Sequence, residues 1–344
     1  MRRVLVTGGA GFIGSHYVRT LLSGTDDLPQ VTVLDKLTYA GNPANLDPVE
    51  GRFAFVKGDI CDAELLAEVV PGHDLVVNFA AESHVDRSIL GAAEFVHTNV
   101  LGTQTLMQAC LDAGTPRVVH VSTDEVYGSI ETGSWDERAP LSPSSPYAAS
   151  KASGDMIALA YHRTHGLPVS ITRSGNNYGP YQYPEKIIPL FATNLMDGLD
   201  VPLYGDGGNV RTWLHVDDHC KGIRIVAERG EPGEVYHIAG TTELTNRWLT
   251  ERLLKLLGAD WTRVRPVPDR KGHDRRYSLS DAKLRTLGYR PTVDFENGLA
   301  ETIEWYAANR AWWTPLCLRP PHEATAPPPT ETGLNGQQAV GRGR

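Results

Sequence analysis

Two pairs of ionisable residues in the middle of the chain have the types and spacing of an acid–base site. Asp124 and Glu125 are adjacent and directly follow Val118–Ser122, an apolar, β-branched run that predicts a strand. Tyr147 and Lys151 lie four residues apart, which places a phenol and an ammonium group on one face of a helix. Paired carboxyl groups can act as acid and base, and a phenol beside a cation can accept a proton. The four residues therefore indicate proton-transfer chemistry.

Each pair also has an ordinary alternative. An Asp-Glu pair is usually a solvated acidic loop, and a Tyr-x-x-x-Lys pair usually lies exposed on a helix. Adjacent residues of a regular strand point to opposite faces, so both carboxyl groups reach one substrate only if the backbone leaves the strand at about Asp124. A free phenol has a pKa of about 10, so Tyr147 needs a positive charge, such as Lys151, to ionise near neutral pH. The catalytic interpretation therefore depends on a nucleotide-binding context.

A glycine-rich turn near the N-terminus supplies that context. The segment Gly8-Gly9-Ala10-Gly11-Phe12-Ile13-Gly14 follows the apolar run Val4–Thr7 and opens a predicted helix. Glycines let the backbone approach a pyrophosphate, whose charge is met by the N–H groups of the helix N-terminus. Asp35 ends the second apolar run, about 20 residues further on, where its carboxylate can accept both ribose hydroxyls and repel a 2′-phosphate. This arrangement favours NAD over NADP.

The elements that must position these residues are predicted to form a doubly wound, parallel α/β sheet of the Rossmann type. Apolar runs recur along the chain, separated by stretches long enough for crossover helices. Long helices are predicted at Ser88–Ala113 and Pro146–His165. The predicted strands are Val4–Thr7, Val31–Leu34, Phe53–Val56, Leu75–Phe79, Val118–Ser122 and Val169–Thr172.

A smaller α/β lobe is predicted after about residue 174, where Gly/Pro-rich connections interrupt the rhythm. We expect residues 1–174 to form the dinucleotide-binding domain and residues 175–318 to form mainly the substrate-binding lobe. Residues 319–344 are rich in proline and poor in large apolar side chains, so we expect a disordered tail. The elements predicted in the lobe are helices near Asp217–Glu228 and Thr245–Leu257 and short strands at Glu234–Ile238 and Val264–Val267.

Composition excludes several classes of protein. The 344 residues carry a net charge of −8, which argues against general binding to nucleic acid or to anionic membranes. No apolar run approaches the roughly 20 residues of a membrane-spanning helix. The first apolar run reaches glycine too soon for a signal peptide. The four cysteines are scattered and suggest neither a zinc site nor a disulfide framework, so we expect a cytoplasmic protein.

The motifs together resemble the extended short-chain dehydrogenase/reductase superfamily and, within it, most closely the dTDP-glucose 4,6-dehydratase family. The resemblance covers residues 1 to about 315 and is carried by the glycine turn, Thr123-Asp124-Glu125, Tyr147-x-x-x-Lys151 and Arg173-Ser174-Gly175-Asn176-Asn177-Tyr178-Gly179-Pro180. The adjacent acids are the specific marker, because the related 4-epimerases and decarboxylases lack them. Two departures stand out. Ser174-Gly175 replaces the usual Cys-Ser, which could loosen the loop carrying Asn176, and Lys271 stands where proline is common.

The resemblance implies a set of site residues. Catalysis is assigned to Thr123, Asp124, Glu125, Tyr147 and Lys151. Cofactor contacts are assigned to Gly8, Gly11, Phe12, Ile13, Gly14, Asp35, Lys36, Leu37, Thr38, Asp59, Ile60, Phe79, Ala80, Ala81, Ser83, Thr98, Tyr147, Lys151 and Asn177. Substrate contacts are assigned to Ser83, Thr123, Asp124, Glu125, Asn176, Lys186, Ile187, Pro202, Leu203, Tyr204, Arg211, Asn246, Asp269, Arg270 and His273. No metal site is expected.

The implied activity is that of a hydro-lyase that converts dTDP-glucose into dTDP-4-keto-6-deoxyglucose with NAD, in deoxysugar biosynthesis. Oxidation at C4, with Tyr147 as base, acidifies the C5 hydrogen. Glu125 then removes the C5 proton, Asp124 protonates the departing C6 hydroxyl, and hydride returns to C6, while Thr123 hydrogen-bonds the C4 oxygen. The resemblance also implies a homodimer joined by the helices near Ser88–Ala113 and Pro146–His165.

Three alternatives remain at this point. A nucleotide-sugar 4-epimerase shares the fold and the Tyr147–Lys151 pair but needs no elimination acid or base. A GDP-mannose 4,6-dehydratase performs the same chemistry on another nucleotide sugar, often with NADP, which Asp35 disfavours. A non-catalytic NAD-sensing protein would keep the glycine turn but has no need of Asp124, Glu125, Tyr147 and Lys151 together.

Overall fold

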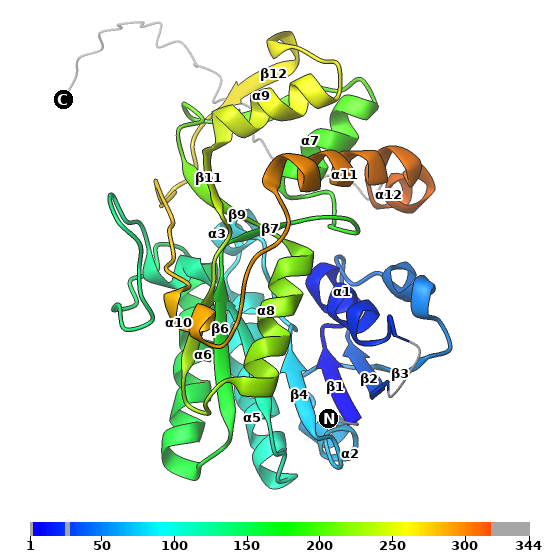
Figure 1. Cartoon of the computed structure of the whole chain (residues 1–344), viewed down its shortest axis with the longest axis vertical. Coiled ribbons are helices and arrows are strands. Elements are labelled where there is room, and N and C mark those ends of the chain that lie inside the picture. The colour runs from blue at the N-terminus through cyan, green and yellow to red at the C-terminus, as the bar shows by residue number, and fades with distance from the viewer. Residues whose placement is uncertain (1–2, 25–27, 318–344) are drawn as a thin grey trace, which may run out of the picture.

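A seven-stranded parallel sheet forms the larger part of the molecule (Figure 1). The computed structural model describes residues 3–24 and 28–317. The strand order is β10-β6-β5-β4-β1-β2-β3, and all six pairings are parallel. The predicted Rossmann-type fold and its six strands are confirmed. The strands are β1 (Arg3–Thr7), β2 (Gln30–Asp35), β3 (Phe53–Lys57), β4 (Leu75–Asn78), β5 (Val118–Thr123), β6 (Val169–Ser174) and β10 (Val235–Ile238).

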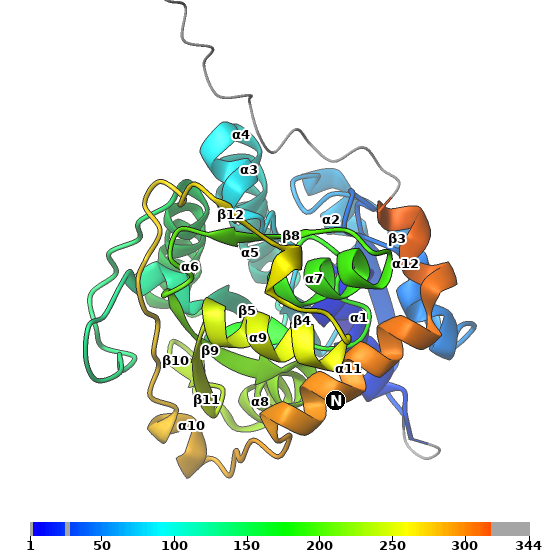
Figure 2. The same ribbon diagram turned by 90° about the horizontal axis from the view of Figure 1, so that it is seen from above.

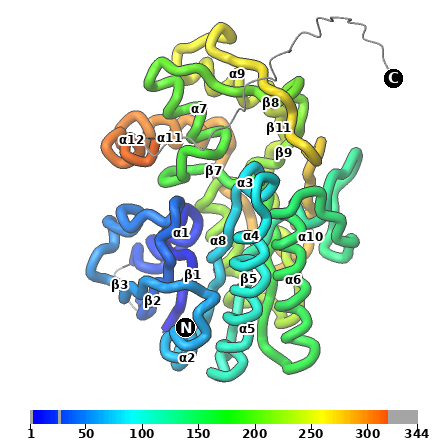
Figure 3. Tube along the Cα trace, turned by 180° about the vertical axis from the view of Figure 1, so that it is seen from behind, coloured from blue at the N-terminus to red at the C-terminus, as the bar shows by residue number. Residues whose placement is uncertain are grey.

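Helices cover both faces of this sheet (Figures 1 and 3). Because successive strand residues point to opposite faces, Leu5 and Val6 of β1 belong to different hydrophobic clusters. Val6 packs with α1 and α8, and Leu5 packs with α2, α5 and α6. The helices are α1 (Phe12–Leu21), α2 (Ala63–Val69), α5 (Thr103–Asp112), α6 (Pro146–His165) and α8 (Val216–Arg229).

The helix predicted over Ser88–Ala113 is not continuous, so that prediction is wrong. The chain forms α3 (Val85–Leu90), α4 (Ala93–Val96), a π-helical turn η2 (His97–Gly102) and only then α5. Gly91 ends α3 in an extended conformation, with φ −162° and ψ 106°. In η2, the lack of a side chain at Gly102 lets the helix approach Ile60, whose Cδ1 would lie 2.8 Å from an added Cβ. Periodicity alone does not register these interruptions.

A smaller lobe lies above the carboxyl ends of the strands (Figures 1 and 2). A hydrophobic cluster that includes Phe191, Leu249, Tyr306 and Trp313 holds it together. Trp313 is fully buried, and the indole N–H of Trp312 donates to the side chain of Asn45 at 3.0 Å. The elements are β7 (Asn176–Tyr178), α7 (Ile187–Met196), β8 (Val201–Tyr204), β9 (Val210–His215), β11 (Thr242–Thr245), α9 (Asn246–Leu256), η4 (Trp261–Arg263), β12 (Val264–Val267), α11 (Phe295–Ala308) and α12 (Arg310–Cys317).

The chain returns from this lobe to the large sheet after residue 174. Helix α8 packs on one face, β10 pairs with β6, and α10 (Ala282–Thr286) packs against β10. Two of the strands and helices predicted beyond residue 174, α8 and β10, thus complete the large sheet rather than the lobe. No described helix is long and apolar enough to cross a membrane. The tail predicted at residues 319–344 lies outside the described part of the chain.

Candidate active site

The glycine turn lies between β1 and α1 and is packed too tightly for larger residues. A Cβ on Gly14 would lie 2.2 Å from the carbonyl oxygen of Gly8, and a Cβ on Gly8 would lie 2.6 Å from the backbone nitrogen of Ala80. Gly8 also has a positive φ of 69°. Helix α1 begins at Phe12, and no side chain caps its N-terminus, which leaves the first N–H groups for an anion. The turn therefore fits a dinucleotide pyrophosphate.

Asp35 is fixed beside this turn at the end of β2. Its carboxylate accepts hydrogen bonds from the N–H groups of Ala10, at 2.9 Å, and Leu37, at 2.8 Å. Burial raises the pKa of Asp35, and the two backbone donors lower it. The oriented carboxylate can accept ribose hydroxyls and opposes a 2′-phosphate. These features fit NAD, as Asp35 predicted.

The segments after β3 and β4 border the same crevice. Lys36 pairs with Asp59 at 2.7 Å, and Ala80 donates its N–H to Asn78 at 3.2 Å. Asp59 also lies near Cys61 and His97, with potential metal-ligating atoms within 4.8 Å of one another. The ammonium group of Lys36 already neutralises Asp59, so the cluster does not favour a metal ion. Thr98, predicted to contact the cofactor, lies in η2.

The acid pair sits where β5 ends. The strand stops at Thr123, and a 3-10 turn, η3 (Asp124–Tyr127), begins at once. The Thr123 hydroxyl accepts a hydrogen bond from the Glu125 N–H at 3.3 Å and donates to the Asp124 carboxylate at 3.2 Å. The backbone therefore leaves the strand at Asp124, as the shared-substrate interpretation required, and Thr123 shapes the turn.

The two carboxyl groups have different surroundings. Asp124 is 3% exposed, and its Oδ2 has no hydrogen-bond partner among the described residues. Burial, followed by the charge of Glu125, raises the pKa of Asp124 to about 8. Burial also raises the pKa of Glu125, but three cations, Lys186, Arg211 and Arg270, oppose that shift. These surroundings favour a protonated Asp124, and the three cations favour the ionised form of Glu125.

Tyr147 and Lys151 come to the same place from the N-terminal half of α6. Ser145 caps the helix by accepting the Ala148 N–H at 3.1 Å, and Tyr147 and Lys151 are both buried. The Lys151 ammonium donates to the carbonyl oxygen of Val121 at 2.8 Å. Burial lowers the pKa of Lys151 to about 8.

The phenol of Tyr147 is influenced by nearby carboxyl groups. Burial raises its pKa, the charges of Glu125 and Asp124 raise it further, and the Thr123 hydroxyl lowers it. These effects place Tyr147, Thr123 and the acid pair at one site, in which Glu125 is half-buried and the other three are buried. Ionisation of the phenol therefore needs the positive charge that Lys151 and a bound nicotinamide would supply.

Cations from the smaller lobe face the acid pair. Lys186 donates to the carbonyl oxygen of Ser83 at 2.8 Å, which joins the lobe to the segment after β4. Arg211, on β9, donates to the carbonyl oxygen of Asp274 at 3.0 Å. Arg270 pairs with Asp86 at 2.7 Å and lies over the ring of Tyr204. The acidic protein thus has a local basic pocket suited to a diphosphate.

The remaining predicted substrate residues line the same lobe. Asn176 and Asn177 lie on β7, and the side-chain oxygen of each lacks a partner among the described residues. His273 and Asp269 contact each other at 2.5 Å in the loop after β12. Among the described residues, no hydrogen bond or ion pair joins the acid pair to Ile187, Pro202, Leu203 or Asn246. These four occupy the start of α7, strand β8 and the start of α9.

Gly175, expected from the sequence as a residue that could loosen the loop, stands where a side chain would not fit. A Cβ there would lie 2.9 Å from the carbonyl oxygen of Thr212 and 3.7 Å from Oδ2 of Asp124. The side chain of Asn177 also donates to the carbonyl oxygen of Gly175 at 3.0 Å. The glycine therefore permits a close approach of β7 and β9 beside Asp124.

Sequence reasoning missed the residues that position the site. Asn99 exchanges two hydrogen bonds with the backbone of Glu82 and donates to Ser150 at 2.9 Å, which links η2, the segment after β4 and α6. Tyr39 donates to Glu185 at 3.1 Å, with the guanidinium of Arg87 over its ring. Asn99 lies inside the mispredicted helix, and the Tyr39–Glu185 contact spans 146 residues, so neither carried a local signal.

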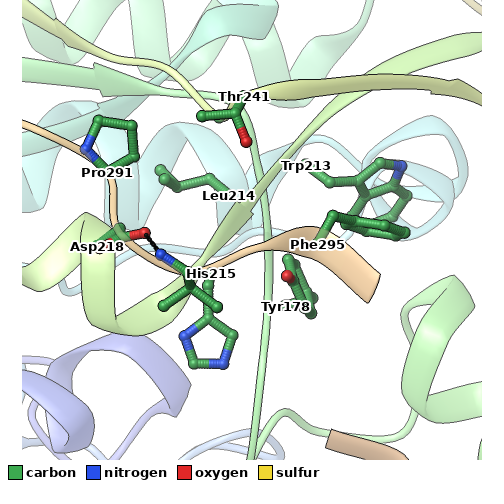
Figure 4. A pocket seen from close by; sticks show the side chains of 10 residues that line it. Tyr178, Trp213, Leu214, His215, Asp218, Thr241, Pro291 and Phe295 are labelled. Atoms are coloured by element: carbon green, nitrogen blue, oxygen red, sulfur yellow. Dashed lines mark hydrogen bonds between the residues drawn. The ribbon is translucent and has the colours of Figure 1, made fainter. Parts of the chain in front are cut away.

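A small pocket lies apart from this site (Figure 4). It is formed by the end of β9, the start of α8 and the segment 291–294 before α11, here called the strap. Tyr178, Trp213 and Phe295 lie on one side of it. The Asp218 carboxylate holds the strap by accepting the N–H groups of Thr292 and Val293, both at 2.9 Å. None of the predicted catalytic residues lines this pocket.

The fold and the site define a dinucleotide-binding enzyme of the extended short-chain dehydrogenase/reductase superfamily, with the adjacent acids Asp124 and Glu125 added to the Tyr147–Lys151 pair. Residues 5–302 match the family model described as GDP-mannose 4,6 dehydratase. The chain belongs to the dTDP-glucose 4,6-dehydratase family, as its curated relatives establish.

Relatives of that name match nearly the whole chain. The dTDP-glucose 4,6-dehydratase of Streptomyces niveus is 61% identical over 95% of this chain and 98% of its own length. The Streptomyces antibioticus enzyme of the same name is 62% identical over 94% and 98%. The crystal structure of a Streptomyces venezuelae dTDP-glucose 4,6-dehydratase with NAD bound has a TM-score of 0.90 and 65% identity, covering 91% of this chain and 99% of that one.

Proposed function

We infer that the chain is an NAD-dependent dTDP-glucose 4,6-dehydratase, a hydro-lyase that forms dTDP-4-keto-6-deoxyglucose. The observation that carries the mechanism is the meeting of Asp124 and Glu125 with Tyr147 in one buried site, with Asp124 more readily protonated than an ordinary aspartate. Oxidation alone needs no such acid. A buried protonated carboxyl group beside an ionised one is suited to an elimination.

Oxidation at C4 uses the α6 pair. NAD, when bound, accepts a hydride from C4 and returns it to C6. Tyr147 takes the proton of the C4 hydroxyl, and the ammonium of Lys151, fixed by the Val121 carbonyl, stabilises the phenolate. The Thr123 hydroxyl hydrogen-bonds the C4 oxygen and orients it toward Tyr147. This step makes the hydrogen at C5 acidic because it becomes α to a ketone.

Elimination uses the acid pair. Glu125, kept ionised by Lys186, Arg211 and Arg270, removes the C5 proton. Asp124, protonated in its buried position, gives its proton to the departing C6 hydroxyl. Glu125 then returns its proton to C5 as C6 is reduced, and the ketone at C4 is kept. The proton that Tyr147 took from the C4 hydroxyl replaces the one that Asp124 gave to the departing water, which resets the enzyme. No external reductant is consumed.

Substrate recognition is assigned to the lobe. Lys186, Arg211 and Arg270 neutralise the diphosphate and the carboxylates, and Tyr204 and His273 pack near Arg270 where the nucleotide would lie. The Rossmann residues from Gly8 to Thr98 hold the cofactor. We assign residues 1–174, completed by α8 and β10, to cofactor binding, and the rest of the described lobe to the sugar nucleotide.

The active unit is proposed to be a cytoplasmic homodimer. Leu90, Val96, Leu101 and Met156 are 82%, 53%, 47% and 57% exposed. They lie on α3, α4, η2 and α6, which pack against one another. Exposed apolar side chains that gather on neighbouring helices favour burial against a second copy of the chain.

A side-by-side assay tests this function. Purified enzyme is given dTDP-glucose, UDP-glucose and GDP-mannose, and loss of water from the sugar is followed by mass spectrometry. We expect dehydration of dTDP-glucose to be fastest by at least about tenfold. The UDP-glucose 4-epimerase of Thermus thermophilus shares the fold, with a TM-score of 0.82 at 34% identity. Conversion of a sugar to its C4 epimer without loss of mass would therefore support an epimerase instead.

A further inference from the structure

A row of buried polar side chains crosses the large sheet beneath α6. Thr7, Asn78 and His120 stand at paired positions on β1, β4 and β5, and Arg173 and His237 are paired on β6 and β10. All five lie on the face that α6 covers, because they alternate with residues of the opposite face. Apolar side chains would normally fill such positions. The row is therefore a built feature that the mechanism above does not use.

Hydrogen bonds fix the protonation of His120. The side-chain oxygen of Asn78 accepts from the Thr7 hydroxyl at 2.6 Å, so its amide nitrogen must face Nδ1 of His120, 3.0 Å away. That nitrogen of His120 is then an acceptor, and the ring carries its proton on Nε2. Nε2 points toward Oδ1 of Asp155 at 3.6 Å. Burial lowers the pKa of His120, and the nearby Lys151 and Arg173 lower it further, so the ring is neutral.

Asp155 is the centre of this row. It is fully buried on α6, one turn beyond Lys151 and two turns beyond Tyr147, so the three side chains form one stripe. Its Oδ2 accepts from Nε of Arg173 at 2.8 Å. The other end of the Arg173 guanidinium donates to the Tyr127 hydroxyl at 2.5 Å, and that hydroxyl contacts His237 at 2.7 Å.

The balance of buried charge points to Lys151. Burial also lowers the pKa of His237, to about 3, so both histidines are neutral. Around them lie one carboxylate, Asp155, and two cationic side chains, Arg173 and Lys151. Arg173 bonds directly to the carboxylate, whereas Lys151 bonds to the Val121 carbonyl and feels Asp155 through space. The ionisable groups that interact with Lys151 are Asp155 on α6, whose charge raises its pKa, and His120 on β5, whose pKa Lys151 lowers together with Arg173 on β6. Asp155 is the one that stabilises the ammonium from below, outside the reacting centre.

We propose that Asp155 is a positioning residue that keeps Lys151 protonated beneath Tyr147, and that Arg173 sets how strongly it does so. This proposal rests on the proposed function, because Lys151 matters through the phenol it activates. Removal of Asp155 leaves two buried cations without an anion, so Lys151 loses its proton more readily. Removal of Arg173 takes away the cation that bonds to the Asp155 carboxylate. That carboxylate then acts on Lys151 alone, so Lys151 holds its proton more firmly. The two substitutions are therefore expected to act in opposite directions.

The test measures the pKa of Lys151 directly, by NMR of side-chain-labelled lysine in NAD-loaded wild type, Asp155→Asn and Arg173→Gln. We expect the pKa to fall by about one unit or more in Asp155→Asn and to rise in Arg173→Gln. The alkaline limb of the kcat–pH profile should move the same way, with a roughly twofold loss of kcat at pH 7 and a roughly tenfold loss above about pH 8 in Asp155→Asn. Asp155→Glu, which keeps the charge, should restore part of the rate.

The control is Asp218→Asn, which removes an equally buried carboxylate that bonds to Lys221 and the strap on the other face of the sheet. It should lower the melting temperature without moving the Lys151 pKa. Shifts of the same sign in Asp155→Asn and Arg173→Gln, or none, would overturn the proposal. If Asp155→Asn does not fold, an unshifted pKa in folded Arg173→Gln overturns it alone. If the two variants show these shifts but the wild-type enzyme does not dehydrate dTDP-glucose, the proposed function is refuted instead.

Discussion

The buried position that suits Asp124 to its proposed role as an acid lowers the stability of the folded protein above about pH 4. Its pKa is raised to about 8 by burial and by Glu125, so the folded protein holds a proton that the unfolded chain releases near pH 4. Between those values the folded state binds more protons, and the free energy of unfolding falls as the pH rises. This loss in the free energy of unfolding is absent below about pH 4 and complete above about pH 8.

Asp124→Asn removes this titration, so we expect it to stabilise the protein relative to wild type as the pH is raised. The difference should be near zero at about pH 4 and reach a few kcal/mol at about pH 8. Urea unfolding of both proteins across this range measures it. A constant difference between the two proteins at all pH values would show that Asp124 does not hold an unusual proton.

The acid pair should separate oxidation from elimination. Asp124→Asn and Glu125→Gln leave Tyr147 and Lys151 in place, so C4 oxidation proceeds while loss of water slows by orders of magnitude. Enzyme-bound NADH should then accumulate, seen as nicotinamide absorbance in stopped flow. Loss of the NADH signal in both variants would mean that the two carboxyl groups act before elimination.

Tyr147→Phe removes one hydroxyl and should abolish the oxidation itself. We expect kcat to fall by at least about a thousandfold, with no NADH signal. The fold should survive, because the ring of Tyr147 keeps its contact with Phe95, at 6.3 Å between ring centres. Circular dichroism and retained NAD provide the control, and near-normal turnover by the folded variant would refute the assignment.

At the scale of elements, the site depends on where strands end. Sequence alone predicted the six strands and the glycine turn, because each has a local signature in β-branched runs or glycines. The break at Asp124 was only a condition that the shared-substrate interpretation required. Thr123 had no such signature as a turn former. The π turn at His97–Gly102 was missed because Gly102 serves long-range packing against Ile60. The break at Gly91 was missed because the apolar periodicity does not register it.

The β1–α1 turn offers a test of an element. In Gly14→Ala the new Cβ would fall 2.2 Å from the Gly8 carbonyl oxygen, so the turn must open. We expect loss of bound NAD and a melting temperature lower by several degrees. Gly51→Ala is the matched control, since Gly51 has open space around it and a φ of 77°. It should cost about 1 kcal/mol of backbone strain and leave NAD bound. Equal loss of NAD in both variants would contradict the assignment of the β1–α1 turn to NAD binding.

At the scale of the whole molecule, the sequence predicted a second lobe but not that the chain returns from that lobe to the large sheet. The return of α8 and β10 to the large sheet was hidden because a short apolar run such as Val235–Ile238 fits either lobe. Likewise the sequence analysis singled out Tyr147 and Lys151 by their spacing but not Asp155, one turn further on. Its meaning appeared only when β5 and β6 brought His120 and Arg173 beneath it.

The proposed dimer is a whole-molecule property. Leu101→Arg and Met156→Arg place charges on the exposed apolar patch, so we expect light scattering to shift from twice 37.6 kDa to 37.6 kDa. Leu199→Arg changes a residue that is 56% exposed in the smaller lobe, and it should leave the mass unchanged. A wild-type mass of 37.6 kDa at micromolar concentration would contradict the dimer.

The central claim is that one active site oxidises C4, removes water across C5 and C6, and returns the same hydride to C6. The most direct measurement uses dTDP-glucose that carries deuterium at C4, with the product identified by NMR and mass spectrometry. We predict dTDP-4-keto-6-deoxyglucose that has lost one water and holds the deuterium at C6, with no added NADH required. A product of unchanged mass, or a dehydrated product without deuterium at C6, would contradict the account.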